Sequence, residues 1–301
     1  MHPKTVDVVG LGQCCLDHIG MIEEYPEVDK KCETTALTIQ GGGPVATALV
    51  ALARWSLRCA IMGIAGDDRF GEEIRASLQK EHIDIEGLHI RRQSASQIAF
   101  IVVEKRSGRR NIFWQCPQGP TLSAGEIDID LITRSRVLHT DGLFAQAALE
   151  ASQAARRSEV PVVVDAGTLR PGMQTLAQHS DYFIASESFG RQLVGRDAPR
   201  ETCLEIHKLG PRLACITLGA SGYVAAFDGR TIEKPAYPVA AVDTTGCGDI
   251  FHAGFIYGLL NGWPWERSLD YAAWSAAQVA LALGGRIGIP KVRDWPGMPP
   301  A

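Results

Sequence analysis

The chain has 301 residues, of which 46% are hydrophobic and 21% are charged, and its formal net charge is −4. These values are typical of one large α/β domain and argue against a basic nucleic-acid binder or a membrane-spanning protein. The N-terminus lacks a secretory apolar stretch, and the eight cysteines contain no CxxC pair. We therefore expect a cytoplasmic protein with reduced, buried thiols and with neither nucleic acid nor membrane as a partner.

Strand-like and helix-like segments alternate along most of the chain. The first are a strand over 6–11, a helix over 44–55, a strand over 59–64 and a helix capped by Asp67 or Asp68. The pattern then predicts strands over 136–139, 161–165, 181–184 and 212–217, and helices over 145–157, 248–261 and 265–283. Strands interleaved with helices imply βαβ units and a mainly parallel sheet.

Two segments interrupt this alternation. Residues 12–40 are extended without a helical period, and residues 88–115 contain strand runs over 97–103 and 110–115 around a turn. They predict either a small separate sheet, such as a flap over a ligand site, or an edge extension of the main sheet.

The strongest motif runs from Asp243 to Asp249, with the sequence Asp-Thr-Thr-Gly-Cys-Gly-Asp, and leads directly into a helix. Unpaired amides and the helix dipole attract anions such as phosphate at a helix start. Asp249 repels phosphate, so its position makes sense if the carboxylate accepts a proton from an attacking hydroxyl. The structural alternative is a glycine turn with a helix cap.

Two further glycine segments are weaker signals. Gly41-Gly42-Gly43-Pro44 opens a helix, either as the backbone wall of a substrate pocket or as a plain turn. Thr217 to Gly222 follows a strand, where ligands of open α/β sheets bind, or else forms a tight hairpin into 223–227. No GxxxxGK[ST] sequence occurs, which excludes a P-loop enzyme.

Together, the 41–44 and 243–249 motifs resemble the two signatures of the ribokinase-like (PfkB) sugar kinases, and the order of motifs fits over nearly the whole chain. The resemblance implies a three-layer α/β/α sandwich with a mainly parallel sheet, as one domain over 1–301. It also implies a β-sheet lid from segments 12–40 and 88–115, often used as a homodimer interface.

The family's site residues carry over by position. The resemblance makes Asp249 the catalytic base, and it places the anion hole at Gly246, Cys247 and Gly248. It assigns sugar binding to Asp17, Gly41, Gly42 and Gly43. It assigns the nucleotide and its metal to Thr217, Gly219, Gly222 and Glu187. ATP with Mg²⁺ would be the cofactor, and Asp243 and Thr245 resemble positions near the monovalent-cation site of K⁺-activated members.

Departures from the ribokinase pattern bear on the substrate. Ala46 and Cys15 stand where ribokinase-type members carry polar residues that contact the sugar. The segments 41–44 and 284–290 look closest to the branch that holds ketohexokinase and sulfofructose kinase. We therefore expect ATP-dependent phosphorylation of a ketose or related polyol. A nucleoside kinase of the same family and a non-catalytic sugar or nucleotide sensor are the alternatives. The lid arginines 91, 92, 106, 109 and 110 would either meet an anionic substrate or form a solvated face.

Overall fold

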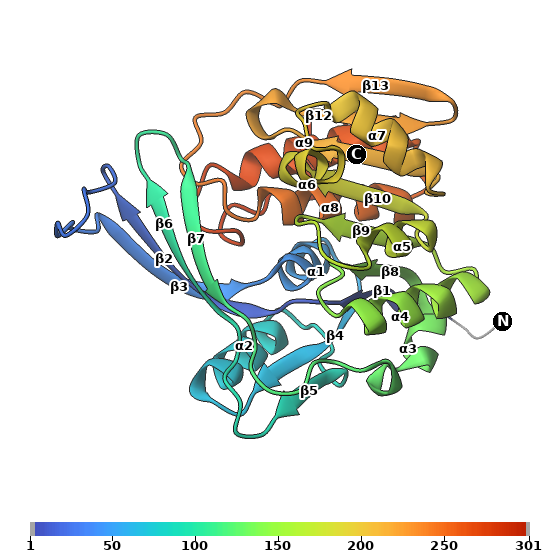
Figure 1. The fold of residues 1–301 in the computed structure, drawn as a ribbon, viewed down its shortest axis with the longest axis horizontal. Coiled ribbons are helices and arrows are strands. Elements are labelled where there is room, and N and C mark those ends of the chain that lie inside the picture. The colour runs from blue at the N-terminus through green and yellow to red at the C-terminus, as the bar shows by residue number, and fades with distance from the viewer. Residues whose placement is uncertain (1–3, 299–301) are drawn as a thin grey trace.

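A nine-stranded sheet forms the centre of the computed structural model, which describes residues 4–298 (Figure 1). Residues 1–3 and 299–301 of the expected domain lie outside the described ones. The sheet has the order β13-β12-β11-β10-β9-β8-β1-β4-β5. Its strands are β1 (Val6–Leu11), β4 (Cys59–Gly66), β5 (Leu88–Arg91), β8 (Ser135–Thr140), β9 (Val162–Ala166), β10 (Tyr182–Ser186), β11 (Leu213–Thr217), β12 (Tyr223–Phe227) and β13 (Arg230–Lys234). All pairings are parallel except those of β12 and β13, so the expected mainly parallel sheet is confirmed.

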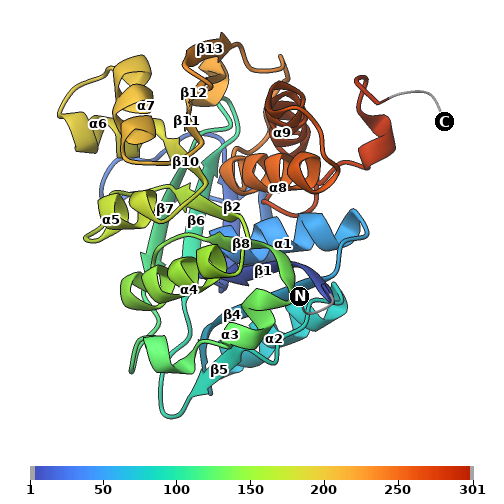
Figure 2. The same cartoon turned by 90° about the vertical axis from the view of Figure 1, so that its right-hand side faces the viewer.

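Helices cover both faces of this sheet, as Figure 2 shows. One face packs against α1 (Pro44–Arg54), α2 (Arg69–Lys80), α8 (Cys247–Leu260) and α9 (Trp265–Val279). The other face packs against α3 (Ile129–Thr133), α4 (Ala145–Arg157), α5 (Met173–Gln178), α6 (Glu187–Val194) and α7 (Pro199–Lys208). The three-layer α/β/α architecture is therefore confirmed, with a continuous apolar core on each side of the sheet.

Local chemistry explains several helix limits. Of the two candidate caps for α2, Asp68 is the one used, because its side chain accepts a hydrogen bond from Gly71 N at 2.8 Å. Helix α9 ends at Val279, four residues before the predicted end. The carbonyl of Ala280 is taken by the amides of Val242 and Asp243, which stops the helical hydrogen-bond pattern there.

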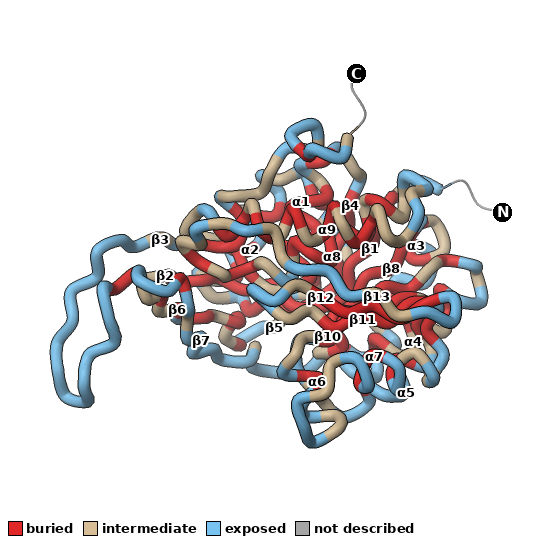
Figure 3. The backbone as a smooth tube through the Cα atoms, turned by 90° about the horizontal axis from the view of Figure 1, so that it is seen from above, coloured by how far each residue is buried: buried red, intermediate tan, exposed pale blue. Residues whose placement is uncertain are grey.

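The interrupting segments form a separate four-stranded sheet with the order β3-β2-β6-β7, which we call the lid (Figure 1). Its strands are β2 (Cys15–Ile22), β3 (Ala36–Gly42), β6 (Ile98–Glu104) and β7 (Arg110–Gln115). Of the expected alternatives, the structure shows the separate sheet, except that β5 pairs with β4 at the edge of the main sheet. The connection between β2 and β3 is exposed at the far end of the lid, as Figure 3 shows.

The lid leans on the main domain through one of its two faces. Ile19, Ala99, Ile101 and Val103 lie on that inner face and pack against Val242 and Leu283, which flank the 243–248 loop. We refer to the opposite side as the outer face. The lid is therefore joined to the start of α8 by an apolar contact.

Two further expectations concern the cysteines and membranes. All eight cysteines are free, but Cys32 and Cys116 are exposed, which corrects the expectation that the thiols are buried. Both lie in loops next to lid strands, outside the apolar core. Within residues 4–298, no helix combines the length and the apolar character needed to cross a membrane.

Candidate active site

The candidate site lies at the carboxyl ends of the parallel strands, between the start of α8 and the inner face of the lid. Ligands of open α/β sheets bind at this edge. Asp141 follows β8, Asp165 lies near the end of β9, and Asp249 lies in the first turn of α8. Asp17 reaches the same region from β2. The topology thus brings together residues that are more than 200 positions apart in the chain.

The 243–248 loop presents backbone amides at the start of α8. Gly246 precedes the helix with φ of 77°, and a Cβ on it would lie 2.5 Å from Gly285 Cα, so only glycine fits. The amides of Gly246 and Gly248 have no backbone partner among residues 4–298, and Cys247 N makes only a 3.4 Å bond to Thr244 O. A Cβ on Gly248 would meet nothing within 4 Å. Open space therefore adjoins Gly248, as an anion site at this helix start requires.

Asp249 stands beside these amides and is half-buried. Its carboxylate accepts no hydrogen bond from the part of the chain that the structure describes, so it is free to accept a proton. Burial raises the pKa of Asp249 well above its ordinary value, and the charge of Asp165 adds to this. The guanidinium groups of Arg110 and Arg286 act in the opposite direction. The result is a carboxylate of raised basicity with cations nearby.

Asp243 braces the loop from inside the core. It is fully buried, and its Oδ1 accepts hydrogen bonds from both N and Oγ1 of Thr245 at 2.8 Å. Its Oδ2 accepts one from Gly284 N at 2.7 Å. Among the described residues, no group of three or more His, Cys, Asp or Glu side chains could hold a metal ion. The cation role expected for Asp243 and Thr245 would need backbone oxygens, and it stays a prediction.

The sugar-side residues meet at the base of the lid. Asp17 is buried, accepts a hydrogen bond from Cys15 Sγ at 2.9 Å, and lies against Gly42 so closely that a Cβ there would overlap its carboxylate. Burial raises the pKa of Asp17. Gly43 has φ of 92° and precedes Pro44, which begins α1. Asp17 and Gly42 therefore lie side by side where β2 pairs with β3. The sugar-binding role expected for Asp17 and the three glycines stays a prediction.

Arg286 is a member of this region that the sequence did not single out. It is only 6% exposed, and its guanidinium occupies the space that a Cβ on Gly41 would need. Its Nη2 donates to Gly42 O at 3.4 Å, and its Nε has no partner in the described part of the chain. The available signal was the pair Gly284-Gly285 before Arg286, because Gly284 lies against Gln40 of β3 and Gly285 lies against Gly246.

Two other buried carboxylates were also missed. Asp165 lies 3.4 Å from Nδ1 of His252, whose ring nitrogens also contact the carbonyl oxygens of Gly248 at 2.7 Å and Ile184 at 3.2 Å. Asp141 accepts hydrogen bonds from the amides of Gln13 and Leu143, and burial raises its pKa to about 6. Aspartate at the end of a buried parallel strand is the signal that could have found both.

The proposed nucleotide side lies at the ends of β10 and β11. Thr217 ends β11, residues 219–221 form a short 3₁₀ helix, and Gly222 has φ of 96° where a Cβ would collide with Lys234 O. The loop therefore leads into an antiparallel hairpin with β12, so the turn prediction is confirmed. Gly219 has open space around it.

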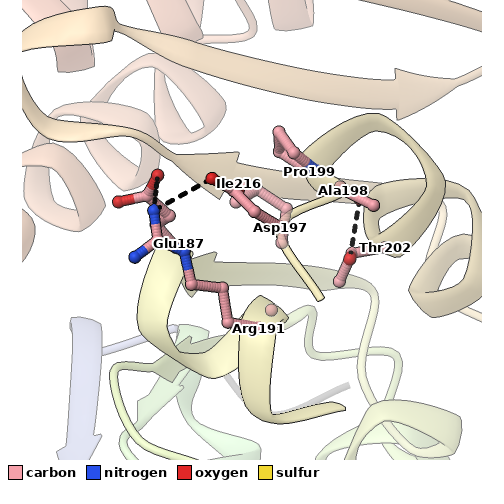
Figure 4. Close-up of a pocket in the computed structure, with 8 residues that line it drawn as sticks. Glu187, Arg191, Asp197, Ala198, Pro199, Thr202 and Ile216 are labelled. Carbon is pink, nitrogen blue, oxygen red and sulfur yellow. Dashed lines mark hydrogen bonds and ion pairs between the residues drawn. The ribbon is translucent and has the colours of Figure 1, made fainter. Parts of the chain in front are cut away.

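Glu187 begins α6 next to this loop. Its carboxylate is paired with Arg191 at 2.9 Å, and Arg191 also bonds Asp197 at 3.1 Å (Figure 4). These residues line a small surface depression, together with Ile216 near the end of β11. The metal role expected for Glu187 stays a prediction, and it requires an exchange of this exposed ion pair.

Free amides at a helix start, a carboxylate beside them and a β-sheet lid packed next to the same loop are typical of an enzyme that transfers phosphoryl groups to small molecules. The comparison with known families agrees. The chain belongs to the pfkB family, because the model described as "pfkB family carbohydrate kinase" matches residues 6–292. It is therefore a carbohydrate kinase, a transferase that phosphorylates an alcohol group.

Individual relatives match along nearly their whole length. The ribokinase of Mus musculus is 29% identical over 315 residues, covering 97% of this chain and 94% of that protein. A putative ribokinase from Agrobacterium tumefaciens has a TM-score of 0.87 at 23% identity, covering 95% of this chain and 94% of that one. A putative ribokinase II from E. coli, solved with ATP and Mg²⁺, has a TM-score of 0.82 at 19% identity, covering 96% and 97%. These structures share the fold.

Proposed function

We propose that this kinase transfers the γ-phosphoryl group of ATP to a sugar hydroxyl, with Asp249 as general base. The hydroxyl oxygen forms a bond to the γ-phosphorus, the bond from that phosphorus to the β,γ-bridging oxygen breaks, and Asp249 takes the hydroxyl proton. The amides of Gly246, Cys247 and Gly248 stabilise the charge on the moving group. The observation that carries the proposal is the unbonded Asp249 carboxylate beside unpaired amides at one helix start.

The donor side of the proposal is ATP with Mg²⁺. The loop from Thr217 to Gly222 supplies glycines at the correct sheet edge, and the E. coli structure with ATP and Mg²⁺ shares this fold. Among residues 4–298, no group of three or more His, Cys, Asp or Glu side chains is arranged to hold a metal ion, which suits a metal that arrives on the nucleotide. When bound, Mg²⁺ neutralises phosphate charge. We also propose that a monovalent cation such as K⁺ binds near Asp243 and Thr245.

For the acceptor, we propose a ketose or a related polyol bound by Asp17 and the glycines 41–43. Ala46 is buried and apolar, and the Cys15 thiol is already bonded to Asp17, so neither offers the polar contact of ribokinase-type members. This favours a sugar other than ribose. The likeness of segments 41–44 and 284–290 to the ketohexokinase and sulfofructose kinase branch supports the same choice.

We also propose a homodimer formed through the outer face of the lid. Leu37, Ile39, Phe100 and Phe113 are 52% to 69% exposed on neighbouring strands, and their register places them on the face opposite Ile19 and Ile101. Apolar side chains gathered in this way are typical of an interface. Light scattering should give twice the chain mass for the wild type and the monomer mass for Phe100→Asp. A wild-type monomer at micromolar concentration would contradict the dimer.

The experiment that tests the function is an ADP-release assay with MgATP over a panel of ketoses, aldoses, polyols, nucleosides and sugar phosphates. We expect turnover on a ketose or polyol, with no sugar-independent ATP hydrolysis of similar rate. Turnover confined to nucleosides would show that the acceptor is a nucleoside and not a ketose or polyol. Thermal stabilisation by a sugar without any phosphorylation would indicate a sensor instead.

A further inference from the structure

His252 is a buried residue of the site region that the proposed function leaves without a role. It lies on α8, three residues after Asp249, and is 3% exposed. Its Nδ1 lies 2.7 Å from Gly248 O and 3.4 Å from Oδ2 of Asp165, near the end of β9. Its Nε2 lies 3.2 Å from the carbonyl oxygen of Ile184, the register partner of Asp165 on β10. The ring therefore fills the space between the first turn of α8 and two neighbouring strands.

Every hydrogen-bond partner that residues 4–298 offer to the two ring nitrogens is an acceptor. The carbonyl oxygens of Gly248 and Ile184 and the ionised carboxylate of Asp165 have no proton to donate. A neutral imidazole carries a proton on only one nitrogen, so the other nitrogen would direct its lone pair at an oxygen lone pair. The imidazolium donates from both nitrogens, and the Asp165 carboxylate balances its charge. These contacts therefore fit a doubly protonated ring.

A second buried histidine beside this ring has the opposite character. The rings of His139 and His252 are 5.7 Å apart, centre to centre. Nδ1 of His139 lies 3.1 Å from Val163 O, while its Nε2 has no partner in the described part of the chain. Burial lowers the pKa of His139 to about 3, and the charge of His252 acts in the same direction, so the ring of His139 is neutral. Of the two rings, the contacts therefore favour a charge on His252 alone.

His252 reaches the proposed base through the peptide that joins Gly248 to Asp249. Gly248 has no side chain, and a Cβ there would meet nothing within 4 Å, so side-chain packing does not fix its conformation. A proton on Nδ1 of His252 anchors the carbonyl oxygen of this peptide from one turn further along α8. The plane of the peptide sets the direction of the Asp249 side chain relative to the amides of the 243–248 loop. An anchored peptide therefore keeps the base at a fixed angle to those amides.

Asp165 reaches the same base through its charge. Burial raises the pKa of Asp249 most, and the Asp165 carboxylate raises it further. The other charged groups that act on Asp249 come from the lid and from the loop after α9, and they are Asp17, Arg110 and Arg286. Of this set, Asp165 is the group that contacts His252. One pair of side chains therefore acts on both the orientation and the electrostatic surroundings of the base.

We propose that Asp165 and His252 form a buried ion pair that positions the base, in which the imidazolium holds the peptide before Asp249 and the carboxylate keeps negative charge beside it. This rests on the proposed function. Neither residue touches the substrate in this role, so both are positioning residues. A misplaced base slows the chemical step without weakening substrate binding, so loss of the pair should act on kcat far more than on KM.

The first test compares His252→Leu and His252→Asn with a matched control. The control His179→Leu removes the same type of contact, from a histidine to the carbonyl oxygen four residues earlier, at the end of α5 on the other face of the sheet. We expect His252→Leu to lower kcat by roughly 10²-fold with the sugar KM within about threefold of wild type. His252→Asn keeps a donor for Gly248 O and should recover most of the loss, and His179→Leu should match the wild type. A lower Tm of His252→Leu with unchanged kcat would overturn the proposal.

The second test, Asp165→Asn, removes the charge and keeps the shape of the side chain. Without the negative charge beside Asp249, the fall of kcat/KM at low pH should move to a lower pH. A purely structural role of Asp165 would leave this pH profile in place. An unshifted profile would show that Asp165 does not act on the base and would overturn the proposal.

Nitrogen NMR of the protein with isotope-labelled histidine tests the ion pair without any substrate. Near pH 7, both ring nitrogens of His252 should carry protons, whereas His139 should keep one bare nitrogen, and the spectrum of His252→Asn assigns the signals. A bare nitrogen on His252 at this pH would overturn the ion pair even if the wild type phosphorylates sugars. If no sugar is phosphorylated, the proposed function fails, while the spectrum still decides whether His252 is charged.

Discussion

Removing the buried negative charge of Asp243 tests whether the 243–248 loop is held from inside the core. In Asp243→Asn, the amide oxygen can keep the two bonds from Thr245, but the new NH₂ group faces the amide of Gly284. Two donors then oppose each other in a site with no exposed surface. We expect the loop to loosen at its joint with residue 284, next to the contact between Gly246 and Gly285.

The magnitude follows from the lost contacts. Leaving a buried donor unpaired costs about 1–3 kcal/mol, and the two remaining bonds weaken by roughly 1 kcal/mol each when their acceptor becomes neutral. The easier desolvation of an amide offsets part of this, which leaves roughly 3 kcal/mol. With an unfolding entropy of about 2.1 cal/mol/K per residue, a chain of 301 residues should lose roughly 5 °C in Tm.

Calorimetry and the ADP-release assay together measure this prediction. The matched control is Asp228→Asn, the same chemical change at an exposed turn position with φ of 49°, which asparagine tolerates well. We expect the control to retain Tm and turnover, and Asp243→Asn to lose about 5 °C and at least about tenfold in kcat. An unchanged Tm with normal turnover would show that Asp243 does not hold the 243–248 loop in place.

Three further predictions concern the site. The carboxylate of Asp249 must be ionised to act as a base, and its pKa is raised above 3.8. When the pH is lowered, kcat/KM should therefore begin to fall at a higher pH than it would for a base with the pKa of an ordinary aspartate. A pH profile of kcat/KM that is flat down to pH 4 would contradict this. For the same reason, ionised Asp249 destabilises the fold above the unfolded pKa, so Asp249→Asn should raise Tm at pH 7 and leave it unchanged near pH 3. Calorimetry at the two pH values tests this, and a lower Tm at pH 7 would count against it. Gly42→Ala should lower kcat/KM for the sugar by roughly 10²-fold, because the new methyl group overlaps the Asp17 carboxylate. The control Gly125→Ala places its methyl group in open space and should keep the wild-type kcat/KM. Equal kinetics of the two variants would show that Gly42 does not contribute to sugar binding.

Much of the fold could be predicted from the sequence, because burial gives the apolar residues of helices and strands a regular spacing. Strands β1, β4, β8, β9, β10 and β11 and helices α1, α2, α4, α8 and α9 were found within a few residues, because the inner strands are apolar on both faces and most of these helices have one apolar stripe. The edge strands β5 and β13 and the short helices α3, α5, α6 and α7 were not predicted. The end of α9 was not predicted because a tertiary contact determines it: the carbonyl oxygen of Ala280 accepts hydrogen bonds from the amides of Val242 and Asp243. No local pattern contains that information.

Part of the candidate site could likewise be predicted from the sequence, and part could not. Asp249 and the glycines near it stand in one short segment, so their chemistry could be inferred from residue types and order. Arg286, Asp165 and Arg110 come to this region from separate elements, and only the folded structure shows that Arg286 and Asp165 are buried and that Arg110 contacts Thr244. An arginine in a strand-turn-strand segment looks solvated until the lid is placed against the 243–248 loop.

Single-turnover phosphoryl transfer by Asp249→Asn, with enzyme in excess over labelled ATP and saturating sugar, tests the central claim most directly. An amide cannot accept the hydroxyl proton, so the rate of product formation should fall by on the order of 10² or more. The ATP dissociation constant, measured on the same preparation, should stay within about threefold. A transfer rate within a few-fold of wild type would show that residue 249 is not the base.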